Sequence, residues 1–141
     1  MLADFPKTTE KEKRTVARRR IAAQDGQAAV RTWGQRHDAG HSPDRRTLAT
    51  AVRYLLEELT ERAPGHSVEV RVPPFGVTQC VEGPSHTRGT PPNVIEIDPT
   101  TWLRLATGGI SWAAAHQAGS ITASGTRADL SVHLPLLRIA G

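Results

Sequence analysis

A helical pattern of apolar positions runs through the segment that follows Asp44. Apolar residues recur there at spacings of three and four, and charged residues occupy the opposite face. The segment starts with Ser42-Pro43-Asp44, which is typical of a helix N-terminus, and ends at Ala63-Pro64-Gly65. It therefore predicts an amphipathic helix whose buried face consists of Leu48, Ala51, Val52, Leu55, Leu56 and Leu59.

A weaker helical pattern precedes this one. Ala22, Gly26, Ala29, Val30 and Trp33 share one face between Thr15 and His37, although Gly26 costs a helix about 1 kcal/mol relative to Ala. The pattern predicts a helix from Thr15 to about His37, with Trp33 as its anchor. Residues 1–14 have little to bury and are expected to form a disordered basic tail.

Four short segments have the patterns of β-strands. Ser67 to Val72 alternates strictly between polar residues and valine, Pro73 to Gly76 interrupts it, and Val77 to Glu82 resumes it. These two segments predict a β-hairpin. Asn93 to Ile97 and Ser120 to Ser124 are the other predicted strands, and a further strand is allowed for elsewhere in the chain.

The segment from Asp98 to Gly125 contains two short helices and a strand separated by glycines. Asp98 and Pro99 suit a helix start, and Gly108-Gly109 suits its end. Ser111 is the expected N-cap of a second helix, Trp112 to Ala118, which Gly119 ends. Leu130 to Leu137 is expected to close the chain as a short helix limited by Pro135.

The order of the motifs in this half of the chain resembles the sterol carrier protein-like superfamily, and most closely its small bacterial orthologues. The motifs are D-P-T-T-W from Asp98, T-G-G-I-S from Thr107, A-G-S-I-T-A-S-G from Ala118 and L-S-V-H-L-P-L-L from Leu130. The resemblance covers roughly Pro43 to Leu137. It implies an α+β fold, in which a mostly antiparallel sheet of about five strands is covered by helices that enclose an apolar cavity for a lipid.

Three regions are therefore expected: the tail at 1–14, a helical extension at 15–42 that the minimal domain of the superfamily lacks, and a sterol carrier protein-like domain at 43–141. The 141 residues suit one domain with such an extension.

A single cysteine excludes an intramolecular disulfide, and no apolar run reaches the roughly 20 residues needed to cross a bilayer. The N-terminus lacks a secretory signal, so the expected location is cytoplasmic.

Charge is distributed unevenly along the chain. Residues 1–62 contain 13 Lys and Arg against 9 Asp and Glu, whereas residues 63–141 contain 5 of each. A basic N-terminus can contact an anionic membrane surface or nucleic acid, but such runs at chain ends are more often solvated tails. Nucleic acid is thus the less favoured partner, and a homodimer through the N-terminal helix stays open.

Catalytic and metal sites find little support. His37 and His41 have an i, i+4 spacing without a nearby glutamate, and no G-x-S-x-G motif is present. Cys80 is a conceivable nucleophile with His86, but lone cysteines in strands are mostly small buried apolar residues. We expect no enzyme activity, no bound metal and no cofactor.

Two groups of residues are candidates for ligand binding. The loop from Gly83 to Asn93 brings together His86 and Arg88, which suit an anionic head group but also suit a fixed turn without function. The apolar candidates either line a lipid cavity, as the resemblance implies, or fill an ordinary core; they are Trp102, Leu105, Ile110, Trp112, Leu130 and Leu134. Two functions follow: binding or transfer of a hydrophobic ligand such as a fatty acid, acyl thioester, isoprenoid or sterol-like lipid, or an interaction module that uses the basic N-terminal helix.

Overall fold

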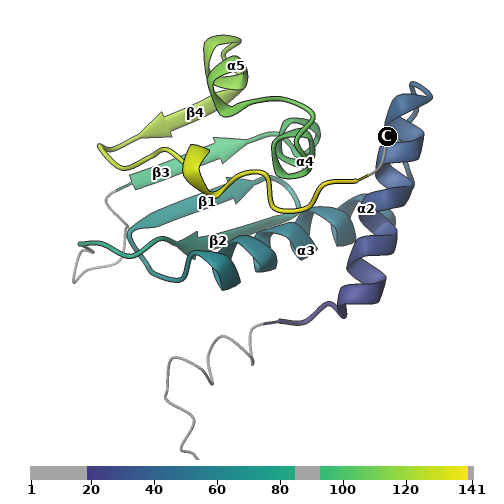
Figure 1. The fold of residues 1–141 in the computed structure, drawn as a ribbon, viewed down its shortest axis with the longest axis horizontal. Coiled ribbons are helices and arrows are strands. Elements are labelled where there is room, and N and C mark those ends of the chain that lie inside the picture. Colours follow the sequence, from purple (N-terminus) through teal and green to yellow (C-terminus); the bar gives the residue numbers. More distant parts are fainter. Residues whose placement is uncertain (1–18, 85–92, 140–141) are drawn as a thin grey trace, which may run out of the picture.

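The computed structural model describes residues 19–84 and 93–139, which form a single sheet with helices on one of its faces (Figure 1). The chain begins with helices α2 (Ala23–Asp38) and α3 (Arg45–Arg62) and continues through strands β1 (Val68–Val72), β2 (Gly76–Cys80) and β3 (Asn93–Ile97). Helices α4 (Pro99–Thr107) and α5 (Trp112–Gln117), strand β4 (Ile121–Ser124) and a 3₁₀ helix (Ser131–His133) complete it.

The sheet has the strand order β2-β1-β3-β4 and is mixed. β1 and β2 form the predicted antiparallel hairpin, and β4 pairs antiparallel with β3. β1 and β3 are parallel, because the chain returns to the starting end of β1 before it enters β3. The α+β class is thus confirmed, but the expected five strands, mostly antiparallel, are four strands of mixed direction within the described residues.

Alternation along the strands decides which face of the sheet is buried. Val68, Val70 and Val72 of β1 and Ile95 and Ile97 of β3 are at most 1% exposed and lie on the face that the helices cover. Glu69, Arg71 and Glu96 lie on the opposite face. α3 contributes the other half of this core through Val52, Leu55 and Leu59, as its apolar pattern predicts.

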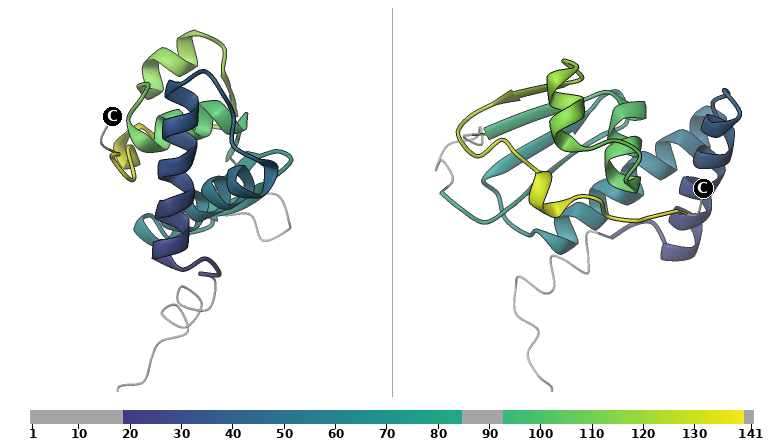
Figure 2. Two further views of the ribbon diagram at one scale, coloured as in Figure 1. Left: turned by 90° about the vertical axis from the view of Figure 1, so that its right-hand side faces the viewer. Right: turned by 45° about the horizontal axis from the view of Figure 1, so that its top comes forward.

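Helix α2 stands at one end of the sheet and packs across α3 (Figures 1 and 2). The prediction that this helix extends back to Thr15 is wrong for residues 19–22, which are not helical; residues 15–18 lie outside the described part. The backbone N–H groups of Arg20 and Ile21 donate to the carboxylate of Glu57 on α3. These hydrogen bonds stabilise a non-helical conformation of the segment, and the helix begins only at Ala23.

The capped helices predicted after Asp98 are confirmed. The Asp98 side chain accepts from the Thr101 N–H, and the Ser111 hydroxyl accepts from the Ala114 N–H. Gly108 ends α4 in the left-handed conformation, with φ at 87°.

The helix expected from Leu130 to Leu137 is wrong. Only Ser131–His133 form a 3₁₀ helix, and Leu134 is extended, because a residue before proline is disfavoured in the helical region. The N–H groups of Leu136 and Leu137 donate to the Ala106 carbonyl at 2.8 and 3.0 Å. The C-terminal segment is therefore tied to α4 and continues to α2 (Figure 1).

Candidate functional site

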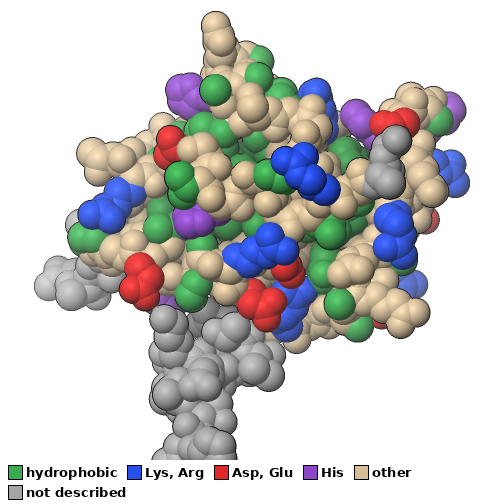
Figure 3. Space-filling view, in the orientation of Figure 1, with side chains coloured by type: hydrophobic (Ala, Val, Ile, Leu, Met, Phe, Trp, Pro, Cys, Tyr) green, Lys and Arg blue, Asp and Glu red, His purple; other side chains and the backbone are tan. Residues whose placement is uncertain are grey.

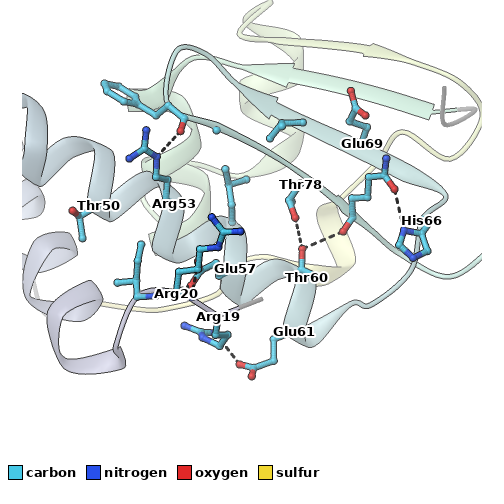
Figure 4. Close-up of a pocket in the computed structure, with 16 residues that line it drawn as sticks. Arg19, Arg20, Thr50, Arg53, Glu57, Thr60, Glu61, His66, Glu69 and Thr78 are labelled. Atoms are coloured by element: carbon cyan, nitrogen blue, oxygen red, sulfur yellow. Dashed lines mark hydrogen bonds and ion pairs between the residues drawn. The ribbon is translucent and has the colours of Figure 1, made fainter. Parts of the chain in front are cut away.

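A groove of about 760 Å³ lies between α3, strand β2 and the short segment that precedes α2 (Figure 4). β2 is an edge strand of the four-stranded sheet, so the groove follows the border between sheet and helix. Apolar side chains in its lining are Ile21, Leu56, Phe75 and Val77. The remaining lining residues are Arg19, Arg20, Thr50, Arg53, Glu57, Thr60, Glu61, His66, Glu69, Gly76, Thr78 and Gln79.

One face of α3 forms the helical wall of this groove. Thr50, Arg53, Glu57, Thr60 and Glu61 follow one another at helical spacing and all line the groove. This stripe lies beside the buried stripe of α3, and Leu56, which is 3% exposed, belongs to both. α3 thus presents one face to the core and an adjacent face to the groove.

Two side-chain hydrogen bonds hold α3 against the edge strand. Arg53 Nε donates to the Phe75 carbonyl at 2.6 Å, and the Thr60 hydroxyl donates to the Gln79 carbonyl at 3.1 Å (Figure 4). The Thr60 and Thr78 hydroxyls also bond to one another. Together these bonds fix the width of the groove along its length. The bond from Thr60 also occupies a carbonyl of the edge strand itself, which limits pairing with another chain.

The segment before α2 closes one side of the groove. Arg19 Nη1 lies 2.8 Å from a carboxylate oxygen of Glu58 and 2.8 Å from one of Glu61, and its guanidinium lies 5.0 Å from the ring centroid of Tyr54. Glu57 accepts from two backbone N–H groups of the same segment. Three consecutive residues of the N-terminal region are therefore held on α3 by three of its glutamates.

The apolar residues predicted to bind ligand lie elsewhere. Trp102, Leu105 and Leu130 are at most 1% exposed within the core, and Trp102 Nε1 donates to the Val52 carbonyl at 3.3 Å. Ile110, Trp112 and Leu134 are half-buried and pack against that core. None of these six residues lines the groove. His86 and Arg88 lie outside the described residues.

The lone cysteine has the environment of a packing residue. Cys80 is fully buried at the end of β2, and this burial raises the pKa of its thiol from 9.0 to about 12. A thiol that stays protonated at neutral pH is a poor nucleophile. Over residues 19–84 and 93–139, no three His, Cys, Asp or Glu side chains are grouped so as to hold a metal ion.

The sequence pattern gave no indication of this groove, because its polar lining is what the solvent face of an amphipathic helix normally contains. Arg53, Glu57 and Glu61 were assigned to that exposed face, and Phe75 to an interrupting turn. The contacts that create the groove join residues 18 or more positions apart, such as Thr60 with Thr78, Arg53 with Phe75 and Arg20 with Glu57. Spacing along the chain does not report such contacts.

A family model described as "Bacterial SCP ortholog" matches residues 44–136, from the start of α3 to the segment that follows the 3₁₀ helix. The chain belongs to this family of bacterial sterol carrier protein orthologues. The match confirms the superfamily resemblance and leaves α2 and the segment before it outside the matched region.

One similar solved structure is the sterol carrier protein-2 like-3 of Aedes aegypti. It shares 19% sequence identity with this chain over 57% of this chain and 88% of that one, with a TM-score of 0.33. No curated protein matches the sequence significantly. Within the described residues, no helix of this sterol carrier protein orthologue is both long and apolar enough to cross a membrane.

Proposed function

We propose that this protein binds an apolar or amphipathic small molecule in the groove between α3 and β2, and that it does so without catalysing a reaction. The observation that carries the proposal is the groove itself, whose lining includes Ile21, Leu56, Phe75 and Val77 among charged and polar side chains. Its volume of about 760 Å³ falls within the roughly 300–1,000 Å³ of small-molecule sites. Membership of a sterol carrier protein-like family supports lipid binding in general.

The composition of the groove fits a ligand with an apolar chain and a polar end. Val77 is 59% exposed on the edge strand, so an apolar ligand has apolar surface to cover there. Burial of a chain stabilises the complex by about 0.8 kcal/mol for each methylene removed from water. Acidic, basic and apolar side chains lie interspersed on the face of the molecule that Figure 3 shows, and the groove, drawn in Figure 4, is likewise lined by charged, polar and apolar residues.

The groove differs from the cavity expected between the sheet and the C-terminal helices. Trp102, Leu105 and Leu130 fill that space in the present conformation, so a ligand there requires α4, α5 and the C-terminal segment to separate. The groove requires no such movement. We therefore propose the groove as the primary site and retain the C-terminal cavity as the competing location that experiments must exclude.

Binding is tested with lipids and two matched variants. Native mass spectrometry and solvent extraction of the purified protein are expected to find an apolar ligand, and a fluorescent fatty acid is expected to bind and be displaced. Val77→Asp puts a charge into the groove at an exposed position and is expected to weaken binding at least tenfold, whereas Val132→Asp, at a position 84% exposed and outside the groove, leaves it unchanged. A clean unliganded mass together with no fluorescent displacement contradicts the proposal.

The alternative function, interaction through the basic N-terminus, is separable from this one. It predicts binding to DNA, RNA or anionic vesicles that weakens steeply with salt and is lost when residues 1–18 are removed. Among the described basic residues of that region, Arg19 already forms ion pairs with Glu58 and Glu61. This intramolecular pairing favours a structural use of the segment, so we place the alternative second. A homodimer and the cytoplasmic location remain predictions.

A further inference from the structure

All carboxylates that line the groove already have donors within the protein. Glu57 accepts from the backbone N–H groups of Arg20 and Ile21, Glu61 pairs with Arg19, and Glu69 pairs with Arg71. Glu58, beside the groove, is shared between Arg19 and Arg62. Each of these carboxylates therefore already accepts from a donor of the protein; Glu58, Glu61 and Glu69 are paired with arginines, whereas Glu57 is bonded to neutral N–H groups and keeps its negative charge.

Two guanidinium groups of the groove retain unused donors. Arg53 uses Nε for the Phe75 carbonyl, and the Arg20 side chain makes no hydrogen bond or ion pair with any of the described residues. Both residues are exposed and both line the groove. In Figure 4 the Arg20 side chain extends from the N-terminal segment over α3, toward the side of the helix that carries Arg53. Guanidinium groups with free N–H donors suit carboxylate and phosphate oxygens.

The geometry points to an anionic end on the ligand: we infer that Arg20 and Arg53 bind a carboxylate or phosphate, while the apolar lining near Phe75 and Val77 covers the attached chain. This inference rests on the proposed function and narrows its ligand class to anionic amphipaths. Arg20 lies outside the matched family region of residues 44–136. The N-terminal extension of this chain therefore contributes a ligand-binding residue in addition to a packing helix.

The test compares three probes with the same chain and different ends. Oleate carries a carboxylate, oleyl phosphate carries a phosphate, and oleyl alcohol is neutral. Wild-type protein is expected to bind both anions about tenfold or more tightly than the alcohol, because one charge-assisted hydrogen bond accounts for a factor of that size. Arg20→Gln is expected to remove most of this advantage and to leave the affinity for the alcohol unchanged. Arg53→Gln also loses the bond to the Phe75 carbonyl, so it is expected to weaken binding of all three probes and to reduce the advantage of the two anions.

Arg31→Gln is the matched control, because Arg31 is exposed on α2 and outside the groove. It makes the same change in net charge, so an effect of overall charge on affinity appears equally in all three variants. Circular dichroism confirms that each variant is folded, and Arg20→Gln keeps the backbone bond to Glu57 in any case.

The outcomes separate this inference from the proposed function. Equal affinity of wild-type protein for oleate and oleyl alcohol, or equal effects of Arg20→Gln and Arg31→Gln, overturns the inference while groove binding stands. Failure of all three probes to bind overturns the proposed function itself. Direct titration with inorganic phosphate is expected to show binding far weaker than that of oleyl phosphate; equal affinities would contradict an amphipathic ligand and indicate a site for the free anion.

Discussion

Gly26 of α2 lies directly against the aromatic ring of Tyr54 on α3. A Cβ atom added to Gly26 would come within 2.1 Å of Tyr54 Cδ1 and 2.7 Å of Cε1. Because Gly26 has no side chain, the two helices can approach closely. Tyr54 makes two further contacts: its hydroxyl accepts a hydrogen bond from Gln27, and its ring lies under the Arg19 guanidinium. Tyr54 therefore contacts both α2 and the segment before it, and is one of the residues that hold the N-terminal extension on the family domain beside the groove.

Gly26→Ala is expected to destabilise the protein despite the better helix propensity of alanine. The gain in propensity is about 1 kcal/mol, whereas displacement of a buried ring costs about 1–3 kcal/mol. Urea unfolding measures the difference. Gly34→Ala serves as the comparison, because its added Cβ would meet only the flexible end of Ile139, at 2.5 Å from Cδ1. If Gly26→Ala is no less stable than Gly34→Ala, the close contact with Tyr54 does not hold.

A second prediction tests whether the predicted C-terminal cavity is a packed core. Leu130 is fully buried and Leu134 is half-buried, so the same truncation removes different contacts at the two positions. Leu130→Ala is expected to cost about 2–5 kcal/mol of unfolding free energy, and Leu134→Ala less than half as much. Thermal or urea unfolding checks both. A small loss at Leu130 comparable to that at Leu134 would show that this space is open or loosely filled.

The parts of the fold that the sequence predicted well are those in which local chemistry decides the structure. Asp98, Ser111 and Gly108 cap their helices through contacts with residues three or four positions away, and the valines of β1 alternate on a single strand. The prediction of a helix in the C-terminal segment was wrong because the N–H groups of this segment bond to the Ala106 carbonyl on α4 and not to carbonyls of its own preceding turn. The parallel pairing of β1 with β3 was missed for a similar reason, since strand direction depends on the connection between strands and not on their patterns.

Asn93 is a single residue whose role also depends on contacts with distant parts of the chain, which the sequence pattern does not report. It was predicted only as the first position of a strand, yet its buried side chain donates to the Ser67 carbonyl and accepts from the Arg127 N–H. Both partners are more than twenty positions away. The groove depends on contacts of this kind, which explains why the candidate site named from the sequence consisted of apolar residues that pack in the core.

A third prediction concerns alkaline pH and Cys80. Burial raises the pKa of this thiol from 9.0 to about 12 in the folded protein, whereas in the unfolded chain the pKa stays near its ordinary value. Below pH 9 the thiol is protonated in both states and stability is unaffected. Between pH 9 and 12 the unfolded state loses the proton that the folded state keeps, so stability falls by up to about 1.4 kcal/mol per pH unit.

The Cys80→Ala variant isolates this effect. Other groups that ionise at high pH affect wild-type protein and Cys80→Ala equally. The unfolding free energy of wild-type protein minus that of Cys80→Ala is therefore expected to be constant below pH 9 and to fall above it. Thiol labelling gives an independent check: Cys80 is expected to react with a thiol reagent at neutral pH only after unfolding. Parallel stability curves up to pH 12, or rapid labelling of the native protein, would contradict the buried environment.

The central claim, that the groove between α3 and β2 is the binding site, is tested most directly by NMR mapping with oleyl alcohol and oleate on isotopically labelled protein. We expect the backbone amides of Gly76, Val77, Thr78 and Gln79, together with Thr60 on α3, to shift on addition of either ligand, and those of Ile110, Trp112 and Leu134 to stay in place. Shifts confined to Ile110, Trp112, Leu134 and their neighbours would instead place the ligand between the sheet and the C-terminal helices, and would contradict this account.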